Sequence, residues 1–153
     1  MIVKKYKNLQ LCVECTLIEL MANLAIHHYP NEYGGFLLGC YSDNLTKLYI
    51  KDFLLIDKYD NSPVEFKREL NLKVHNFEKI FRETGLYYIG EWHSHPNATA
   101  WYSSTDLQAM QNIASCNTVQ LKNPVLSILS ISSNKLLDFN FFLFDEGRLV
   151  IYE

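Results

Sequence analysis

The sequence predicts an α/β sandwich in which about three helices pack on a mixed β-sheet. Two observations predict this fold class: strand-like and helix-like apolar patterns alternate along the chain, and the strands outnumber the helices. No internal repeat, low-complexity tract or Gly/Ser-rich linker interrupts the 153 residues. A chain of this length can bury a sizeable core, so we expect a single domain that spans residues 1–153.

The strands are predicted from short apolar or alternating runs that are bounded by turn residues. In chain order they cover Leu9–Val13, Phe36–Cys40, Leu48–Ile56, Tyr87–Trp92, Pro124–Ile131, Leu136–Phe144 and Leu149–Tyr152. The turn-forming run Ser42-Asp43-Asn44 joins the second of these strands to the third. Pro96–Tyr102 is expected to be a loop.

Helices are predicted where apolar residues recur three or four positions apart. The first such set is Leu17, Leu20, Met21, Leu24 and Ala25, the second is Leu70, Val74, Phe77 and Phe81, and the third is Leu107, Met110 and Ile113. Pro30 ends the first helix, and Gly85 follows the second in the position of a C-terminal cap. The third helix should begin at about Ser104.

Composition and charge narrow the function classes. Hydrophobic residues make up 48% of the chain and aromatic residues 14%, as in globular rather than disordered proteins. The formal net charge of -3 argues against a nucleic-acid partner, because such proteins usually carry a basic stripe. The sequence has neither a signal-peptide pattern nor an apolar run of membrane-spanning length. We therefore expect a cytoplasmic protein without a membrane partner.

Cys12 and Cys15 form a C-x-x-C pair, which in other proteins binds zinc or performs redox chemistry. No second pair follows, since Cys40 and Cys116 stand alone, and the pair spans a predicted strand-to-helix junction. We interpret these residues as packed, reduced thiols, with zinc or redox chemistry as the alternative.

The stretch Gly90-Glu91-Trp92-His93-Ser94-His95-Pro96 is the main candidate for chemistry. If the strand continues through His95, its period of two places both imidazoles on one face, with Cα atoms roughly 7 Å apart. Two side chains at that separation can converge on one metal ion at about 2.1 Å. Asp106 then offers a carboxylate from the first turn of the next helix.

Two neutral imidazoles and one carboxylate suit Zn²⁺ and leave a fourth position for water, as in catalytic rather than structural zinc sites. Zinc in such a site lowers the pKa of its water to about 7. The sequence therefore predicts one Zn²⁺ per chain on His93, His95 and Asp106. The run from Ser103 to Asp106 also fits a helix capping box, and the two interpretations are compatible because capping can hold the ligand carboxylate in place.

These residues form a motif that resembles the signature of the JAB/MPN (JAMM, Mov34/MPN/PAD-1) zinc metallopeptidases. Its parts are Glu32 with Gly34-Gly35, His93-x-His95, seven residues that start with Pro96, and Ser103-x-x-Asp106. The resemblance covers nearly the whole chain and implies the MPN/JAB fold, a cytidine-deaminase-like mixed sheet. His95–Leu107 looks like deubiquitinases associated with endosomal sorting. Gly90–His93 and the compact length look more like small stand-alone bacterial JAB isopeptidases of CBASS and Bil-type antiphage conjugation systems.

The resemblance assigns the general base to Glu32, on the loop that enters the Gly34-Gly35 strand, and an oxyanion-stabilising hydrogen bond to Ser103. From strand register alone, Glu91 is a rival base, because it faces the same side as His93. Glu91 can instead be an outer hydrogen-bond partner of a ligand histidine. For Ser103 the alternative is helix capping alone.

Most members of the resembled family cut after the C-terminal tail of ubiquitin or a ubiquitin-like protein. This implies a ubiquitin-like protein or its conjugate as substrate, with the activating and conjugating enzymes of the same pathway as partners. Such a tail would bind as an extended strand at a sheet edge. Trp101 and Tyr102 are candidate contacts for it, with ordinary loop packing as the alternative.

The stretch after Asp106 is expected to hold one helix and three strands. It therefore lacks the insertion with a second zinc site that recognises the proximal ubiquitin in endosomal deubiquitinases, and we expect no linkage selectivity. A peptidase that processes sulfur-carrier proteins, a small-peptide metallopeptidase and a non-catalytic scaffold remain alternative functions.

Overall fold

In residues 1–68 and 76–153, which the computed structural model describes, eight strands form one curved mixed sheet and two form a separate hairpin. The sheet strands are β1 (Ile2–Tyr6), β2 (Leu9–Val13), β3 (Gly34–Tyr41), β4 (Lys47–Leu55), β7 (Tyr87–Pro96), β8 (Val125–Ile131), β9 (Leu136–Asp145) and β10 (Arg148–Ile151). The hairpin consists of β5 (Tyr59–Ser62) and β6 (Glu65–Arg68). The helices are α1 (Cys15–His27), α2 (Phe77–Thr84) and α3 (Ser104–Ser115).

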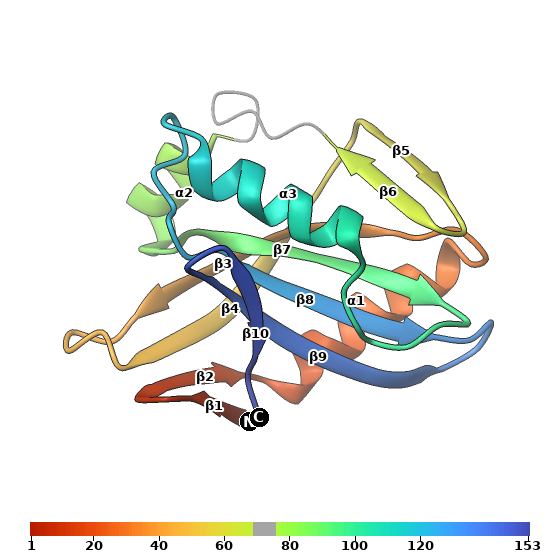
Figure 1. The fold of residues 1–153 in the computed structure, drawn as a ribbon, viewed down its shortest axis with the longest axis horizontal. Coiled ribbons are helices and arrows are strands. Elements are labelled where there is room, and N and C mark those ends of the chain that lie inside the picture. The colour runs from red at the N-terminus through yellow and green to blue at the C-terminus, as the bar shows by residue number, and fades with distance from the viewer. Residues whose placement is uncertain (69–75) are drawn as a thin grey trace.

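β7 lies in the interior of the sheet, between β3 and β8 (Figure 1). The strand order is β1-β2-β4-β3-β7-β8-β9-β10, in which the pairs β2–β4 and β7–β8 are parallel. The sheet almost closes on itself, because the backbones of Lys5 and Glu153 exchange hydrogen bonds of 2.6 and 2.9 Å. The two chain ends therefore lie together, on the far side of the sheet from the β5–β6 hairpin (Figure 1).

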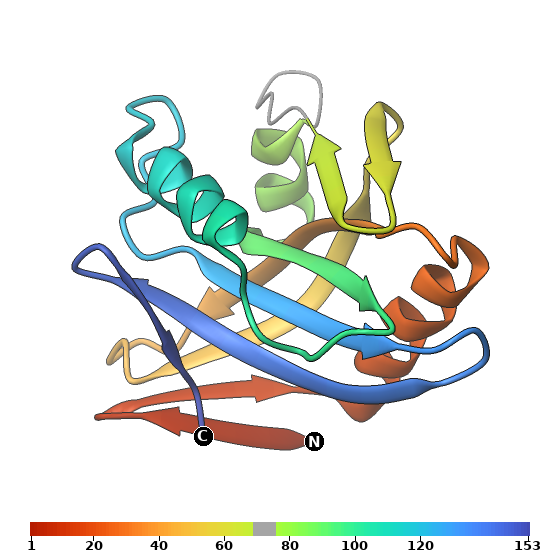
Figure 2. The same ribbon diagram turned by 45° about the vertical axis from the view of Figure 1, so that its right-hand side comes forward.

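Each face of the sheet has its own apolar core. The core under α1 includes Met21 of the helix and Trp92 of β7. The core under α2 and α3 includes Phe77, Met110 and, from β3, Phe36. Figure 2 shows α1 and α3 on opposite sides of the sheet. Side chains that alternate along β7 therefore enter two different environments.

A β-bulge interrupts the pairing of β3 with β7 just before the histidines. The register shifts between Leu37 and Leu38 of β3, which leaves Ile89 as the extra residue of β7. Gly90 follows with a φ of 153°, and a Cβ at this position would lie 1.9 Å from the carbonyl oxygen of Val125. Only glycine fits there, because any side chain would collide with the backbone of β8.

The predicted strands are all present, and α1 and α3 lie where the apolar spacing places them. α2 begins at Phe77, and Leu70 and Val74 of the predicted helix lie outside the described residues. Gly85 ends α2 in the left-handed conformation, with a φ of 72°, as predicted. β7 continues through His95 to Pro96, so the first residue of the predicted loop belongs to the strand. The sequence prediction lacks β1 and the β5–β6 hairpin.

The four cysteines are free. Cys12 is buried in β2, whereas Cys15 is exposed on the first turn of α1, so the expected strand-to-helix junction is confirmed but only one of the two thiols is packed. No cysteine belongs to a cluster that could hold a metal ion in the described part of the chain. Within residues 1–68 and 76–153, no helix has the length and apolar character needed to cross a bilayer.

Candidate metal centre

β7 carries both histidines on the face toward α3, and both side chains are largely buried. His93 is 9% and His95 8% exposed. β3 approaches β7 closely here, because a Cβ on Gly34 would lie 2.1 Å from the carbonyl oxygen of Trp92 and 2.8 Å from the Cβ of His93. A larger residue at position 34 would therefore displace the strand that bears the first histidine, which explains why glycine follows the Glu32 loop.

The two imidazoles and the Asp106 carboxylate converge on one point. The Nε2 atoms of His93 and His95 are 3.1 Å apart. Asp106 places Oδ1 at 3.1 Å from His93 Nε2 and Oδ2 at 3.4 Å from His95 Nε2. On the other side of its ring, His95 Nδ1 lies 3.1 Å from the Thr99 carbonyl oxygen, to which it donates. In the neutral ring this tautomer leaves the Nε2 lone pair directed at the cluster.

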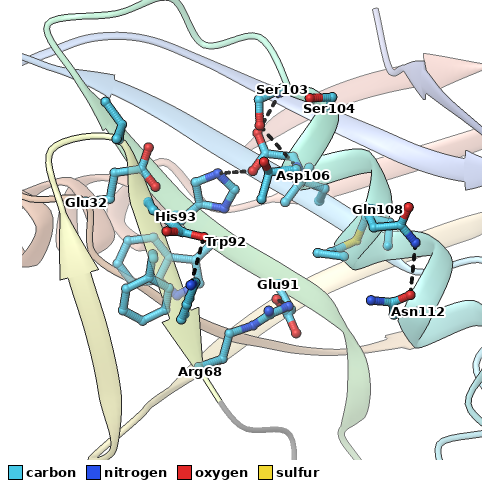
Figure 3. Close-up of a pocket in the computed structure, with 18 residues that line it drawn as sticks. Glu32, Arg68, Glu91, Trp92, His93, Ser103, Ser104, Asp106, Gln108 and Asn112 are labelled. Carbon is cyan, nitrogen blue, oxygen red and sulfur yellow. Dashed lines mark hydrogen bonds and ion pairs between the residues drawn. The ribbon is translucent and has the colours of Figure 1, made fainter.

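Asp106 is held in place by the N-terminus of α3. Ser103 and Asp106 form a capping box: the Ser103 amide donates to Asp106 Oδ2 at 2.7 Å, and the Asp106 amide donates to Ser103 Oγ at 3.1 Å. The same carboxylate therefore caps the helix and faces His93 (Figure 3). The capping and ligand interpretations of this run are thus geometrically compatible, as the sequence analysis expects.

These three residues fit a zinc ion. In a tetrahedral site with ligand atoms about 2.0–2.1 Å from zinc, two ligand atoms lie roughly 3.4 Å from each other. The separations of 3.1, 3.1 and 3.4 Å between the facing atoms of His93, His95 and Asp106 are close to that value. A set of two imidazoles and one carboxylate is also chemically suited to Zn²⁺.

The charge state of the cluster favours a cation. Burial alone would raise the pKa of Asp106, but hydrogen bonds from His93 and His95 hold it well below its usual range. Burial alone would lower the pKa of His95, but the hydrogen bond and charge of Asp106, together with the charge of Glu32, raise it above its ordinary value. Asp106 is therefore an anion at neutral pH, as a metal-binding carboxylate must be.

Glu32 approaches the cluster from the opposite side of the His93 ring to Asp106 (Figure 3). Its Oε1 lies 3.8 Å from His95 Nε2, and one ligand atom of each of Glu32, His93 and His95 lies within 4.8 Å of the others. The side chain is 6% exposed, and burial raises the pKa of its carboxyl although the two histidines lower it. The two histidines could thus bind a metal ion together with either Asp106 or Glu32. The contacts of Asp106 with the histidines are shorter than the contact of Glu32 with His95. The longer Glu32 contact places its carboxylate beside the cluster of His93, His95 and Asp106.

Glu91 lies on the same face of β7 but is already paired. Its carboxylate forms a buried ion pair with Arg68 at the end of the β5–β6 hairpin, and Tyr88 Oη donates to it at 3.3 Å. Glu91 is 4% exposed. A carboxylate whose charge is balanced by a buried guanidinium is a poor proton acceptor, so this geometry favours Glu32 over Glu91 as the base.

The other predicted site residues lie at the edge of the cluster. Ser103 is exposed and uses its Oγ as the acceptor in the cap. Trp101 stacks on Tyr102 with ring centroids 5.6 Å apart, and both rings pack edge-on against Phe142. This packing matches the alternative interpretation of the two aromatics, but Trp101 still exposes 49% of its surface beside Ser103.

A cavity of about 630 Å³ is lined by Glu32, His93, Ser103 and Asp106, and residues 64–68 of the β5–β6 hairpin form one of its walls. This wall, including Arg68, is not predicted from the sequence. The only signal for Arg68 is Glu91 itself, because an acid in a buried strand requires a partner of opposite charge. That signal predicts a cation but does not say which one.

Comparisons with known proteins agree with this geometry. Residues 16–141 match a family described as prokaryotic homologs of the JAB domain. Over 121 residues the chain is 31% identical to a CD-NTase/cGAS isopeptidase of Enterobacter hormaechei subsp. hoffmannii. That alignment covers 76% of this chain and 65% of the relative, so the chain spans slightly less than two thirds of that protein.

Two solution structures share the architecture. A protein from Desulfitobacterium hafniense superposes with a TM-score of 0.66 at 23% identity, covering 94% of this chain and 90% of that one. A protein from Salinibacter ruber gives a TM-score of 0.60 at 20% identity, covering 92% and 88% of the two chains. At these sequence identities the two structures support a shared fold and nothing about function. The family match extends over most of the sequence and includes both histidines and Asp106, so the chain belongs to the prokaryotic homologs of the JAB domain and has the MPN/JAB fold.

Proposed function

We propose that this protein is a zinc-dependent hydrolase that cleaves the amide or isopeptide bond after the C-terminus of a ubiquitin-like protein. The observation that carries the proposal is the convergence of His93, His95 and Asp106 on one point, with Glu32 beside them. These three residues would hold one Zn²⁺, which acts as a Lewis acid and lowers the pKa of a water when bound.

Glu32 would act as the general base. A proton acceptor in hydrolysis must reach the attacking water directly, and the 3.8 Å gap between Glu32 and His95 leaves it next to the cluster without occupying it. Its burial keeps bulk water from the carboxylate, and the raised pKa makes it a better base than an exposed glutamate. The proton taken from water would then be delivered to the leaving amine.

Ser103 would steady the substrate oxygen. In the capping box its Oγ accepts a hydrogen bond, so the hydroxyl proton is still available to donate. A donor at this position can stabilise the carbonyl oxygen of the substrate as negative charge develops on it. The exposed ring of Trp101, two residues earlier, would line the approach of the substrate tail.

The similarity to a protein named as an isopeptidase supports an isopeptide bond as the scissile bond. We therefore propose a CD-NTase/cGAS conjugate of a ubiquitin-like protein as the substrate, in an antiphage conjugation pathway. The cavity is lined by the cluster, by α3 and by the hairpin. Recognition should lie mainly in the ubiquitin-like protein and its tail.

One assay series tests this proposal: a single tail with several leaving groups, then several tails with one leaving group, each with and without chelator. We expect chelator to stop cleavage, and changes in the tail residues next to the cut to alter kcat/KM far more than changes in the leaving group. Dominance of the leaving group, or cleavage of short free peptides alone, would replace the isopeptidase proposal by a general metallopeptidase.

A further inference from the structure

The backbone of Glu32 is held from two sides, although this residue lies outside any strand. On one side its amide donates to the Ser62 carbonyl oxygen at 2.8 Å, and its own carbonyl accepts from Asn61 Nδ2 at 3.0 Å. On the other side the neighbouring Tyr33 exchanges hydrogen bonds with Ser94: Tyr33 N donates to Ser94 Oγ at 3.0 Å, and Ser94 N donates to the Tyr33 carbonyl at 2.8 Å. Ser94 lies between the two histidines, so this second contact fixes the loop to β7, the strand that carries both histidines.

The β5–β6 hairpin is itself fixed to the body of the protein. Tyr59 and Phe66 pack against Tyr33, with ring centroids 5.5 and 5.9 Å away. Arg68, the register partner of Tyr59 in the hairpin, pairs with Glu91 of β7. The position of the hairpin is therefore fixed by its own contacts. Its hydrogen bonds with Glu32, made by Asn61 and Ser62, can hold the Glu32 loop in place.

Of the two hydrogen bonds made by the Glu32 backbone itself, the one from the Asn61 amide comes from a side chain, so a substitution can remove it. A loop residue has no ladder of hydrogen bonds to fix its position, so the direction of the Glu32 side chain depends on how its two backbone groups are held. Misplacement of a reacting group by about 1 Å can reduce a rate roughly 100-fold. The hydrogen bond also satisfies the part-buried carbonyl of Glu32.

We propose that Asn61 is a positioning residue for the general base: by bonding the Glu32 carbonyl, the hairpin holds the Glu32 carboxylate in line with the histidine cluster. This proposal rests on the proposed function in taking Glu32 as the base. In the described part of the chain, the Asn61 side chain donates its hydrogen bond to Glu32 and forms none with the histidines or Asp106. It acts through Glu32.

The test compares Asn61→Ala and Asn61→Asp, which both remove the donor, with Asn123→Ala. Asn123 is a matched control, because its Nδ2 donates to the Phe144 carbonyl at the same distance of 3.0 Å, away from the cluster. With a ubiquitin-like fusion as substrate and zinc-loaded protein, we expect both Asn61 variants to lower kcat about 10- to 100-fold, as a misplaced base would. KM and zinc content should stay within about twofold, and Asn123→Ala should match the wild type.

A second comparison separates positioning from general damage to the fold. Introduced into Glu32→Gln protein, Asn61→Ala should cause no further loss of residual activity, because its effect passes through the carboxylate that is already absent. A further loss in this background, or a parallel change in KM and zinc content, would show that Asn61 only stabilises the structure and would overturn the proposal. Wild-type kcat in both single variants would overturn it as well.

Amide hydrogen exchange at Glu32 gives a readout that does not depend on activity. Loss of the Asn61 hydrogen bond should speed exchange of the Glu32 amide, which donates to the adjacent Ser62, while exchange of Ser94 in β7 stays unchanged. If the wild type cleaves no ubiquitin-like fusion, the proposed function is wrong. The exchange experiment then still shows whether Asn61 fixes the backbone of Glu32. Unchanged exchange at Glu32 in Asn61→Ala overturns the inference whatever the activity.

Discussion

Two buried carboxylates line the same cavity and have different neighbours. Glu91, in the middle of β7, pairs with Arg68 and accepts a hydrogen bond from Tyr88. Glu32, on the loop before β3, has a 3.8 Å contact with His95 as the only ionic contact of its carboxylate in the described part of the chain. Both are at most 6% exposed, so burial alone does not separate them.

The difference shows what makes a buried acid structural or reactive. A carboxylate that has a guanidinium partner has already compensated for its lost hydration, and a proton would have to displace that partner. A carboxylate held mainly through its backbone keeps its oxygens free for water. We therefore expect Glu91 to stabilise the fold and Glu32 to perform chemistry, and three experiments of decreasing expected effect examine this division.

The largest effect should come from removing a metal ligand. The activity that remains then serves as the lower limit against which the Glu32 and Glu91 variants are compared. His95→Ala or Asp106→Ala should lose most of the zinc, because a site with two protein ligands rarely retains the ion. Cleavage should fall to the level seen with chelator. Metal analysis of the purified variants checks this, with His27→Ala, an exposed histidine of α1, as the control that keeps its zinc. Full zinc content in both ligand variants would show that the centre is wrongly assigned.

Direct comparison of the two acids should give the next effect. Glu32→Gln should lower kcat about 10²- to 10⁴-fold while keeping zinc and fold, since only the proton acceptor is removed. Glu91→Gln should reduce kcat by about tenfold or less, as changes that act through a neighbouring residue often do. Steady-state kinetics with zinc analysis distinguishes the two. The opposite order of severity would make Glu91 the base.

The smallest effect on activity, but a clear one on stability, should follow from separating the ion pair. Arg68→Met leaves Glu91 buried without a charged partner, which should lower the free energy of unfolding by roughly 3–5 kcal/mol. The double variant Arg68→Met with Glu91→Leu should recover most of this loss, because no charge is then left uncompensated. Denaturant unfolding measures both, and Arg82→Met on the exposed face of α2 is the control. Equal stability of the single and double variants would argue that Glu91 does not depend on Arg68.

The convergence of His93, His95 and Asp106 follows from local rules, whereas their role as metal ligands stays a prediction. His93 and His95 share a strand face by the period of two, and Asp106 begins the next helix, so short-range rules place all three. The MPN/JAB fold is confirmed by the family match and the mixed sheet. The roles of Glu32, Ser103, Trp101 and Tyr102 stay predictions.

The β5–β6 hairpin cannot be predicted from the sequence pattern, for a physical reason. Tyr59–Ser62 and Glu65–Arg68 are short and mostly polar, without the alternation of a half-buried strand. The pair of Asn61 with Glu32 joins residues 29 positions apart, and that of Arg68 with Glu91 spans 23. Single contacts between loops and hairpin edges leave no periodic trace in one sequence. β1 is missed because the consecutive lysines Lys4 and Lys5 interrupt its apolar alternation.

The bulge at Ile89 determines which face of β7 carries chemistry. A strand has an odd and an even set of residues, and inserting one residue exchanges the two sets from that point onward. Upstream, Tyr88 belongs to the core under α3 and Ile89 to the core under α1. Downstream, Trp92 lies in the core under α1, so the odd-numbered histidines can face α3.

Pairing of β3 with β7 without the bulge, with Ile89 kept in a regular strand, would therefore invert the site rather than weaken it. Without the bulge, the indole of Trp92 would point into the cavity and both imidazoles into the apolar core beneath α1. A residue gained or lost between the bulge and the histidines would likewise turn both imidazoles toward the core under α1. The register of this one strand therefore decides whether the two histidines face Asp106.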